Sequence, residues 1–117
     1  MGAETAIAVA TAFNDAINRA DLDELVALMT PDHRFVDAAG GTVEGRGACA
    51  DAWDGFFRSF PDYRNEFATV DVDGAGRVVA EGRSHCSVAV LDGPARWIAT
   101  VSGDRVAEWR VEDPGPG

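Results

Sequence analysis

Residues 63–91, YRNEFATVDVDGAGRVVAEGRSHCSVAVL, decide the fold that we expect for this chain. In residues 63–73 and 77–91, apolar and polar side chains alternate with a period of two, which is typical of a strand with one buried face. The DGAG segment between them consists mostly of turn-forming residues. The stretch therefore predicts an antiparallel hairpin.

The same alternation continues toward the C-terminus. ARWIATVS occupies residues 95–102 and RVAEWRVED residues 105–113; the turn signal DGP precedes the first and GD the second. Consecutive strands joined by turn signals predict an antiparallel meander.

Helical patterns precede these strands. Apolar residues recur at helical spacing from residue 3 to 20, and Asp21, followed by Glu24, predicts the N-cap of a short second helix. A third helix is predicted at 47–60, before Pro61. Helices followed by a run of strands predict an α+β domain over residues 1–112, and the DPGPG segment at 113–117 predicts a disordered tail.

A further strand, HRFVDA at residues 33–38, carries Asp37 at its end, directly before Ala-Ala-Gly-Gly. One interpretation is that this carboxylate is a functional group delivered by the strand. The alternative is that it caps the turn, which is a common role of aspartate.

Composition narrows the possible partners. The chain has 117 residues, which suits one core, and its 20 Asp and Glu against 10 Lys and Arg give a net charge of −10. Nucleic acids and anionic membranes are therefore not expected to bind. No apolar run approaches the length of roughly 20 residues needed to span a bilayer, so we expect a cytoplasmic protein.

Motifs for metals and cofactors are not evident. Cys49 and Cys86 lack CxxC spacing and are expected to be small buried side chains, while His33 is expected near the surface. With no HExxH, P-loop or GxGxxG pattern, we expect neither a metal nor a cofactor.

Four segments in order carry a resemblance to a known family: residues 12–41, residues 56–67, GRSH at 82–85 and GDRVAEWRVED at 103–113. Together they resemble the SnoaL-like, ketosteroid-isomerase-like branch of the nuclear-transport-factor superfamily. The resemblance implies a curved antiparallel sheet wrapped around the N-terminal helices, forming a cone with a deep apolar pocket at its open end.

The resemblance implies a role for Asp37, which matches the general-base aspartate of ketosteroid isomerases. Those enzymes also use a tyrosine and a protonated aspartate to stabilise the enolate, and Phe13 and Trp97 stand at these positions. Since losing one such donor costs about 10²–10³ in rate, efficient steroid isomerisation by that mechanism is not expected.

Two neighbouring families match other positions. His85 matches a histidine of SnoaL-like cyclases, but Trp97 and Ile98 stand where those enzymes carry their base aspartate. Epoxide hydrolases of this fold use an Arg-x-Asp pair and a last-strand aspartate; this chain has Arg83 and His85 for the pair and Val111 for the aspartate.

A period of two places Glu81, Arg83 and His85 on one side of their strand. Family geometry implies that this side faces the pocket near Asp37, with His85 as acid/base partner and Arg83 as a source of positive potential. The alternative is that Arg83 pairs with Glu81 across the sheet surface, which leaves His85 half-buried and without a catalytic role.

Aromatic residues are candidates for lining the pocket. One or two of Trp53, Phe57, Phe60, Trp97 and Trp109 are expected to touch a ligand, and the others to pack in the core. Phe13, at the position of the missing tyrosine, belongs to the same candidate set for substrate binding.

These observations support two classes of function. The first is a cofactor-independent enzyme that transfers a proton on a polyketide-, steroid- or terpenoid-like molecule, or an epoxide hydrolase in which Asp37 or His85 activates water and Arg83 polarises the epoxide. The second is a non-catalytic ligand-binding or dimerising protein. A homodimer is expected because such cones often dimerise, and exposed Val70, Val72 and Val88 would indicate its interface.

Overall fold

The computed structural model describes residues 2–114, which form three α-helices, a 3₁₀ helix and one six-stranded sheet. The helices are α1 (Ala3–Asn18), α2 (Leu22–Ala27), α3 (Arg46–Ser59) and the 3₁₀ helix η1 (Ala89–Leu91). The strands are β1 (Met29–Val36), β2 (Thr42–Glu44), β3 (Arg64–Val72), β4 (Val78–His85), β5 (Gly93–Ser102) and β6 (Arg105–Glu112). Residues 115–117, most of the tail expected at 113–117, lie outside the described residues.

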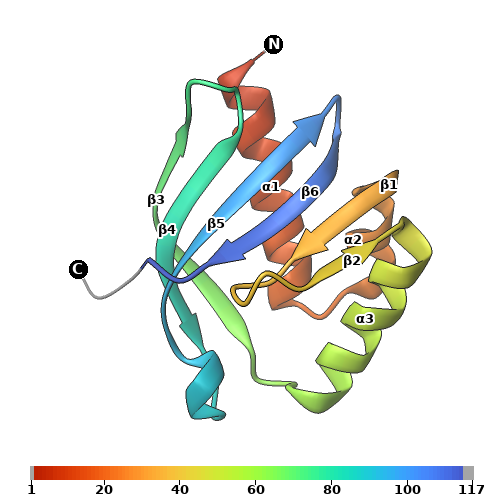
Figure 1. Ribbon diagram of the computed structural model, residues 1–117, viewed down its shortest axis with the longest axis vertical. Helices are drawn as coiled ribbons and strands as arrows, with labels where there is room; N and C mark the ends of the chain where they lie inside the picture. Colours follow the sequence, from red (N-terminus) through yellow and green to blue (C-terminus); the bar gives the residue numbers. More distant parts are fainter. Residues whose placement is uncertain (1, 115–117) are drawn as a thin grey trace.

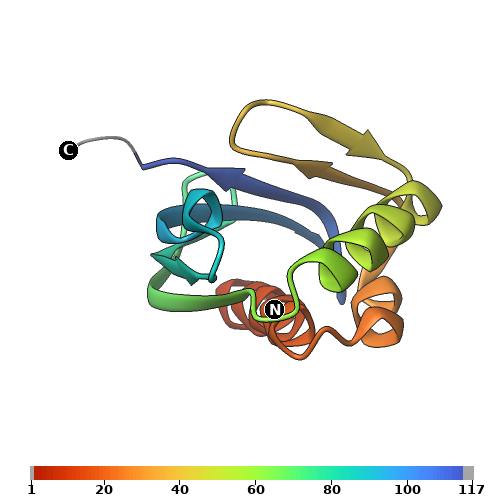
Figure 2. The same cartoon turned by 90° about the horizontal axis from the view of Figure 1, so that it is seen from below.

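The sheet is curved and unclosed, with strand order β2-β1-β6-β5-β4-β3 (Figure 1). All three α-helices lie against its concave side (Figure 2), which confirms the predicted α+β class and the wrapped sheet. One pair departs from the antiparallel expectation, because β1 runs parallel to β6 with Phe35 opposite Trp109. A parallel pair is possible here because a long connection, rather than a tight turn, separates β1 from β6.

The second helix begins where the sequence predicts. The Asp21 side chain accepts a hydrogen bond from the backbone N–H of Glu24 at 3.2 Å, which satisfies one of the free donors at the helix start.

Two short elements differ from the expectation. The chain after Gly40 pairs with β1 as β2, placing Val43 opposite Phe35, although no strand is predicted for this segment. The strand expected to reach residue 91 ends at His85. Beyond it, Asp92 and Asp62 accept hydrogen bonds from the backbone N–H groups of Cys86 and Ser87, so side chains replace the strand ladder there.

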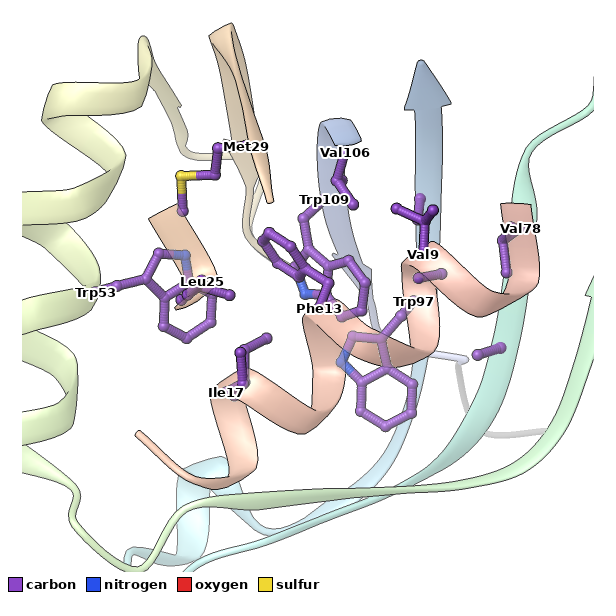
Figure 3. Packing of buried hydrophobic residues seen from close by; sticks show 14 of the residues in the cluster. Val9, Phe13, Ile17, Leu25, Met29, Trp53, Val78, Trp97, Val106 and Trp109 are labelled. Carbon is purple, nitrogen blue, oxygen red and sulfur yellow. The ribbon is translucent and has the colours of Figure 1, made fainter. Parts of the chain in front are cut away.

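The core lies between α1 and the concave face of the sheet. Figure 3 shows Phe13, Trp97 and Trp109 gathered where α1 crosses β5 and β6. All three side chains are at most 1% exposed, and the Phe13 and Trp109 ring centroids are 4.7 Å apart. Burying a side chain of this size contributes about 1.5–3 kcal/mol, so these residues hold the helix on the sheet.

The apolar residues expected to mark a dimer interface lie elsewhere. Val70 and Val72 pack against the core, because a bulge between Phe67 and Thr69 shifts the alternation of β3 by one residue. Val88 is exposed, but it precedes η1 and is not on a sheet face. Val70 and Val72 therefore lie half-buried on the inner side of β3 and form no exposed patch on the outer face of the sheet.

Candidate functional site

A cavity of about 520 Å³ opens at one end of the curved sheet. It lies between the C-terminal ends of β1 and β6, the start of β5, and the helices α3 and η1. Most of its wall is apolar: Phe35, Val43, Trp53, Phe56, Ala95 and Trp109. Six polar side chains also border it, four of them carboxylates: Asp37, Tyr63, Ser84, Asp92, Glu112 and Asp113. The cavity therefore suits a largely apolar molecule with a few polar groups.

Asp37 follows β1 directly and reaches the cavity wall. Its Oδ1 atom accepts hydrogen bonds from the backbone N–H groups of Ala39 (2.9 Å) and Gly41 (2.8 Å). A Cβ atom added at Gly41 would lie only 2.6 Å from Oδ2 of Asp37, so glycine leaves room for the carboxylate. Both interpretations of Asp37 are thus compatible: it caps the turn and also borders the cavity.

Arg83 and His85 do not border the cavity. Arg83 donates to Oδ2 of Asp92 at 3.1 Å, and Nε2 of His85 lies 3.1 Å from Oε1 of Glu66. The residue of this segment that reaches the cavity is Ser84, which is 6% exposed. The structure therefore brings neither Arg83 nor His85 together with Asp37.

The alternation of β4 is as predicted, but the face assigned to the pocket is wrong. Val78 and Ala80 are buried in the core, so Ser84 shares their face, and Glu81 points outward to pair with Arg96 at 2.9 Å. Apolar residues of a strand take the buried side, and in β4 they occupy even-numbered positions.

Among the aromatic candidates, Trp53 and Trp109 border the cavity. Phe57 packs on Trp53 with ring centroids 5.6 Å apart, and Phe60 packs on Phe56 at 4.9 Å. Both of these phenylalanines are half-buried, pack against aromatic side chains of α3 and do not line the cavity.

Phe13 and Trp97 also lie outside the cavity wall. Both are enclosed in the core, and Trp97 packs on Phe67 with centroids 5.0 Å apart. The indole N–H of Trp97 is buried and has no hydrogen-bond partner among residues 2–114. At these positions the chain therefore presents no hydrogen-bond donor to a molecule in the cavity.

Sequence reasoning missed a polar cluster behind the cavity wall. The Tyr63 hydroxyl lies 3.2 Å from Oγ of Ser84, which donates to Oδ1 of Asn65 at 2.9 Å. Asn65 bonds in turn to Asn14 through its side chain and to Asn18 through its backbone. The available signal was that Asn14 and Asn18 are four residues apart and therefore share one face of α1.

Asp92 forms the opposite rim of the cavity. Its carboxylate accepts from the backbone N–H of Cys86 and from Arg83, each at 3.1 Å, and these hydrogen bonds lower the pKa of Asp92. Asp92 is therefore ionised at neutral pH, and its contacts fix the segment that carries η1.

His33 is fully buried, contrary to the expectation that it lies near the surface. It shares the inner face of β1 with Phe35, and its Nδ1 lies 2.6 Å from the carbonyl oxygen of Val106. Burial lowers the pKa of His33, although the Val106 carbonyl acts in the opposite direction. The ring is therefore neutral, with Nδ1–H donating to Val106, while Nε2 has no partner among residues 2–114.

Both cysteines are free thiols. Cys49 is fully buried, as predicted, and burial raises its pKa, whereas Cys86 is only half-buried and its thiol contacts Asp62. Across residues 2–114, no three His, Cys, Asp or Glu side chains are grouped so that they could hold a metal ion. Over the same residues, no helix has the length and apolar character needed to cross a membrane.

A curved sheet wrapped around helices, with an apolar cavity at its open end, defines the class of α+β cone proteins. Within this class, the chain belongs to the SnoaL-like domain family, whose sequence profile matches residues 10–115. A search of curated proteins finds no match to the chain.

Solved structures share the fold at low sequence identity. A polyketide cyclase candidate from Sinorhizobium meliloti is 19% identical with a TM-score of 0.79, over 89% of this chain and 93% of that one. An LEH-like epoxide hydrolase from Mycobacterium tuberculosis is 19% identical with a TM-score of 0.80, over 94% of this chain and 83% of that one. A Catenulispora acidiphila protein with a ketosteroid isomerase-like fold is 18% identical with a TM-score of 0.73, over 90% and 84%.

Proposed function

We propose that this protein is a cofactor-independent enzyme that binds a hydrophobic small molecule of polyketide, steroid or terpenoid type and moves a proton on it. One observation carries the proposal: the Asp37 carboxylate stands on the wall of an otherwise largely apolar cavity of about 520 Å³. The SnoaL-like family and the cyclase-like and isomerase-like neighbours support this class of function at the level of the fold.

Asp37 is arranged to act as the base. Oδ1 is fixed by two backbone N–H groups, whereas Oδ2 receives no hydrogen bond from residues 2–114. An apolar ligand that covers the carboxylate displaces water from it, and a desolvated carboxylate is a stronger base. A proton taken from carbon next to a carbonyl would then pass to Oδ2 and return to another carbon.

The test uses 1-tetralone, a flat, apolar and enolisable ketone. In D₂O, proton NMR follows exchange of its α-protons with and without the protein. We expect the wild type to accelerate exchange and Asp37→Asn to reduce the acceleration by about 10²-fold or more, the usual contribution of a general base. Asparagine retains an oxygen that can cap the turn, so the change removes the base and not the local fold.

The matched control is Asp104→Asn, in the turn between β5 and β6 at the opposite end of the sheet from the cavity. Exchange should be unchanged in this variant. Equal loss in both variants would contradict the assignment of Asp37.

A second candidate function is binding without catalysis. It is favoured by the outward orientation of Arg83 and His85, which leaves Asp37 without the acid/base partners that the resemblance implied. Saturable quenching of tryptophan fluorescence by 1-tetralone, with no acceleration of exchange, would support this candidate. The epoxide-hydrolase alternative has less support, because it requires Arg83 beside the epoxide.

A further inference from the structure

Two of the polar side chains on the cavity wall, Tyr63 and Ser84, are hydrogen-bonded to each other, and Ser84 is hydrogen-bonded to buried Asn65. Behind them, Asn65 is 3% exposed and Asn14 is 5% exposed, so the cluster is shielded from water. Buried polar groups are stable only when their hydrogen bonds are made, and the bonds within this cluster define which atom donates and which accepts.

The donor and acceptor of each hydrogen bond in this cluster can be assigned in order, beginning with Asn14 on helix α1. Nδ2 of Asn65 donates to Oδ1 of Asn14 at 3.2 Å, so the carbonyl oxygen of the Asn65 amide points to Ser84. That oxygen can only accept, and it receives the Ser84 hydroxyl proton at 2.9 Å. Since a serine hydroxyl has one proton, Oγ of Ser84 is left as an acceptor toward Tyr63.

It follows that Tyr63 donates its own proton to Ser84 across 3.2 Å. The Tyr63 oxygen then offers the cavity a lone pair and no proton. Burial raises the pKa of Tyr63, although the neighbouring Ser84 and Asn65 side chains act in the opposite direction. The phenol therefore stays neutral near pH 7 and keeps this arrangement.

We infer that the cavity selects apolar ligands that carry a hydroxyl or another hydrogen-bond donor, which donates to the hydroxyl oxygen of Tyr63. The inference rests on the proposed function in one respect, since it requires a ligand in the cavity. It does not require proton transfer at Asp37. The inference also states which ligands are disfavoured. A ligand that offers only a carbonyl or ether oxygen at this position places one acceptor against another and forms no hydrogen bond with Tyr63.

The test compares three naphthalenes of similar shape by equilibrium dialysis: 2-naphthol, which can donate, and 2-methoxynaphthalene and 2-acetylnaphthalene, which can only accept. We expect the wild type to bind 2-naphthol about three- to tenfold more tightly than its methyl ether, the usual worth of one hydrogen bond. Tyr63→Phe keeps the ring, which packs edge-on against Phe56 at 4.8 Å, and should abolish the difference by weakening 2-naphthol alone.

Ser84→Ala provides a readout that a purely structural role would not give. Without Oγ, the Tyr63 proton loses the acceptor that holds it and becomes available to a carbonyl in the cavity, in competition with Oδ1 of Asn65. Binding of 2-acetylnaphthalene should therefore strengthen relative to 2-naphthol. Ser102→Ala, at the far end of β5, is the matched control and should leave all three affinities unchanged. Circular dichroism checks that each variant is folded.

The outcomes separate the two proposals. Equal affinity of the wild type for 2-naphthol and its ether, or a preference for 2-acetylnaphthalene, would overturn the inference about Tyr63 and leave the proposed function standing. Binding of none of the three naphthalenes would contradict the cavity as a site for apolar ligands, and the inference would fall with it.

Discussion

His33 is enclosed in apolar surroundings, with its ring centroid 5.5 Å from that of Phe13. Burial lowers the pKa of this histidine in the folded protein, whereas the unfolded chain exposes it with a pKa of about 6.5. When the pH falls below that value, the unfolded state takes up a proton more readily than the folded state does. The stabilising contribution of neutral His33 is therefore present above pH 6.5 and is lost as the pH falls below it.

We predict that lowering the pH from 7.5 to 5.5 reduces the free energy of unfolding through His33, by at most about 1.4 kcal/mol, the limit for one proton taken up by the unfolded state alone. Urea denaturation at both pH values measures this change. His33→Asn retains a donor for the Val106 carbonyl and should remove most of the pH dependence. His85→Asn changes the other histidine, on the outside of the sheet, and should preserve it; the reverse result would contradict the prediction.

Individual residues show how far the sequence leads. The position of Asp37 at a strand end follows from its neighbours and is seen in the structure. The side of β4 that faces the core cannot be predicted in the same way. A period of two divides the side chains into two sets but does not show which set is buried. Val78 and Ala80 decide it by filling the core beneath α1, and this depends on packing between elements far apart in the chain.

At the scale of elements, β3 and β4 are shaped by a bulge and a glycine. Gly82 lies opposite Phe67, next to the bulge between Phe67 and Thr69. A Cβ atom added at Gly82 would collide with the backbone carbonyl of Glu66. Glycine therefore permits the close approach of two strands where the sheet curves.

We predict that Gly82→Ala lowers the free energy of unfolding by roughly 1–3 kcal/mol, the usual cost of overpacking, since backbone atoms must move. Thermal or urea denaturation measures it. The matched control is Gly55→Ala in α3, where the new Cβ would meet nothing within 4 Å. Alanine there should stabilise the helix by about 0.5–1 kcal/mol. Similar stability of wild type and Gly82→Ala would refute the role of the close contact.

Elements with a local sequence signal were predictable, and the two shortest elements, which have none, were not. The helical periodicity of α1 and α3 and the cap at Asp21 are local signals, and each is confirmed. Strand β2 and helix η1 have three residues each, too few to show a period. Strand β2 forms because it pairs with β1. The segment that contains η1 is held by hydrogen bonds to the carboxylates of Asp62 and Asp92.

At the scale of the whole molecule, none of the α-helices formed by residues 2–114 covers the outer face of the sheet (Figure 2). Its centre contains Ile98 and Val36, both opposite Arg110 of β6; they are only 8% and 4% exposed, although neither packs in the core cluster on the inner side. Arginines on this face pair with glutamates: Arg34 with Glu108 at 2.8 Å, and Arg96 with Glu81 at 2.9 Å. The face is therefore close to neutral on a chain whose net charge is −10.

The near-neutral charge of the outer face favours association of two copies through this face. Two copies that each carry a net charge of −10 repel one another, and repulsion is smallest where opposite charges are already paired around an apolar centre. We predict that the protein is a homodimer joined through the outer face of the sheet. Size-exclusion chromatography with light scattering should then give twice the monomer mass.

Ile98 is itself too buried to take a charge without damage to the fold. The variant Thr100→Asp therefore tests the interface, because Thr100 is half-buried on the same outer face of β5. A two-fold axis near this residue would bring two new carboxylates together in a desolvated position, so the variant should be monomeric while circular dichroism remains unchanged. Val90→Asp adds the same charge at the mouth of the cavity, where Val90 is 87% exposed, and should remain dimeric. A monomeric wild type would contradict the dimer, whereas dissociation by Val90→Asp alone would move the interface from the sheet to the rim of the cavity, where a partner copy would control access of ligands.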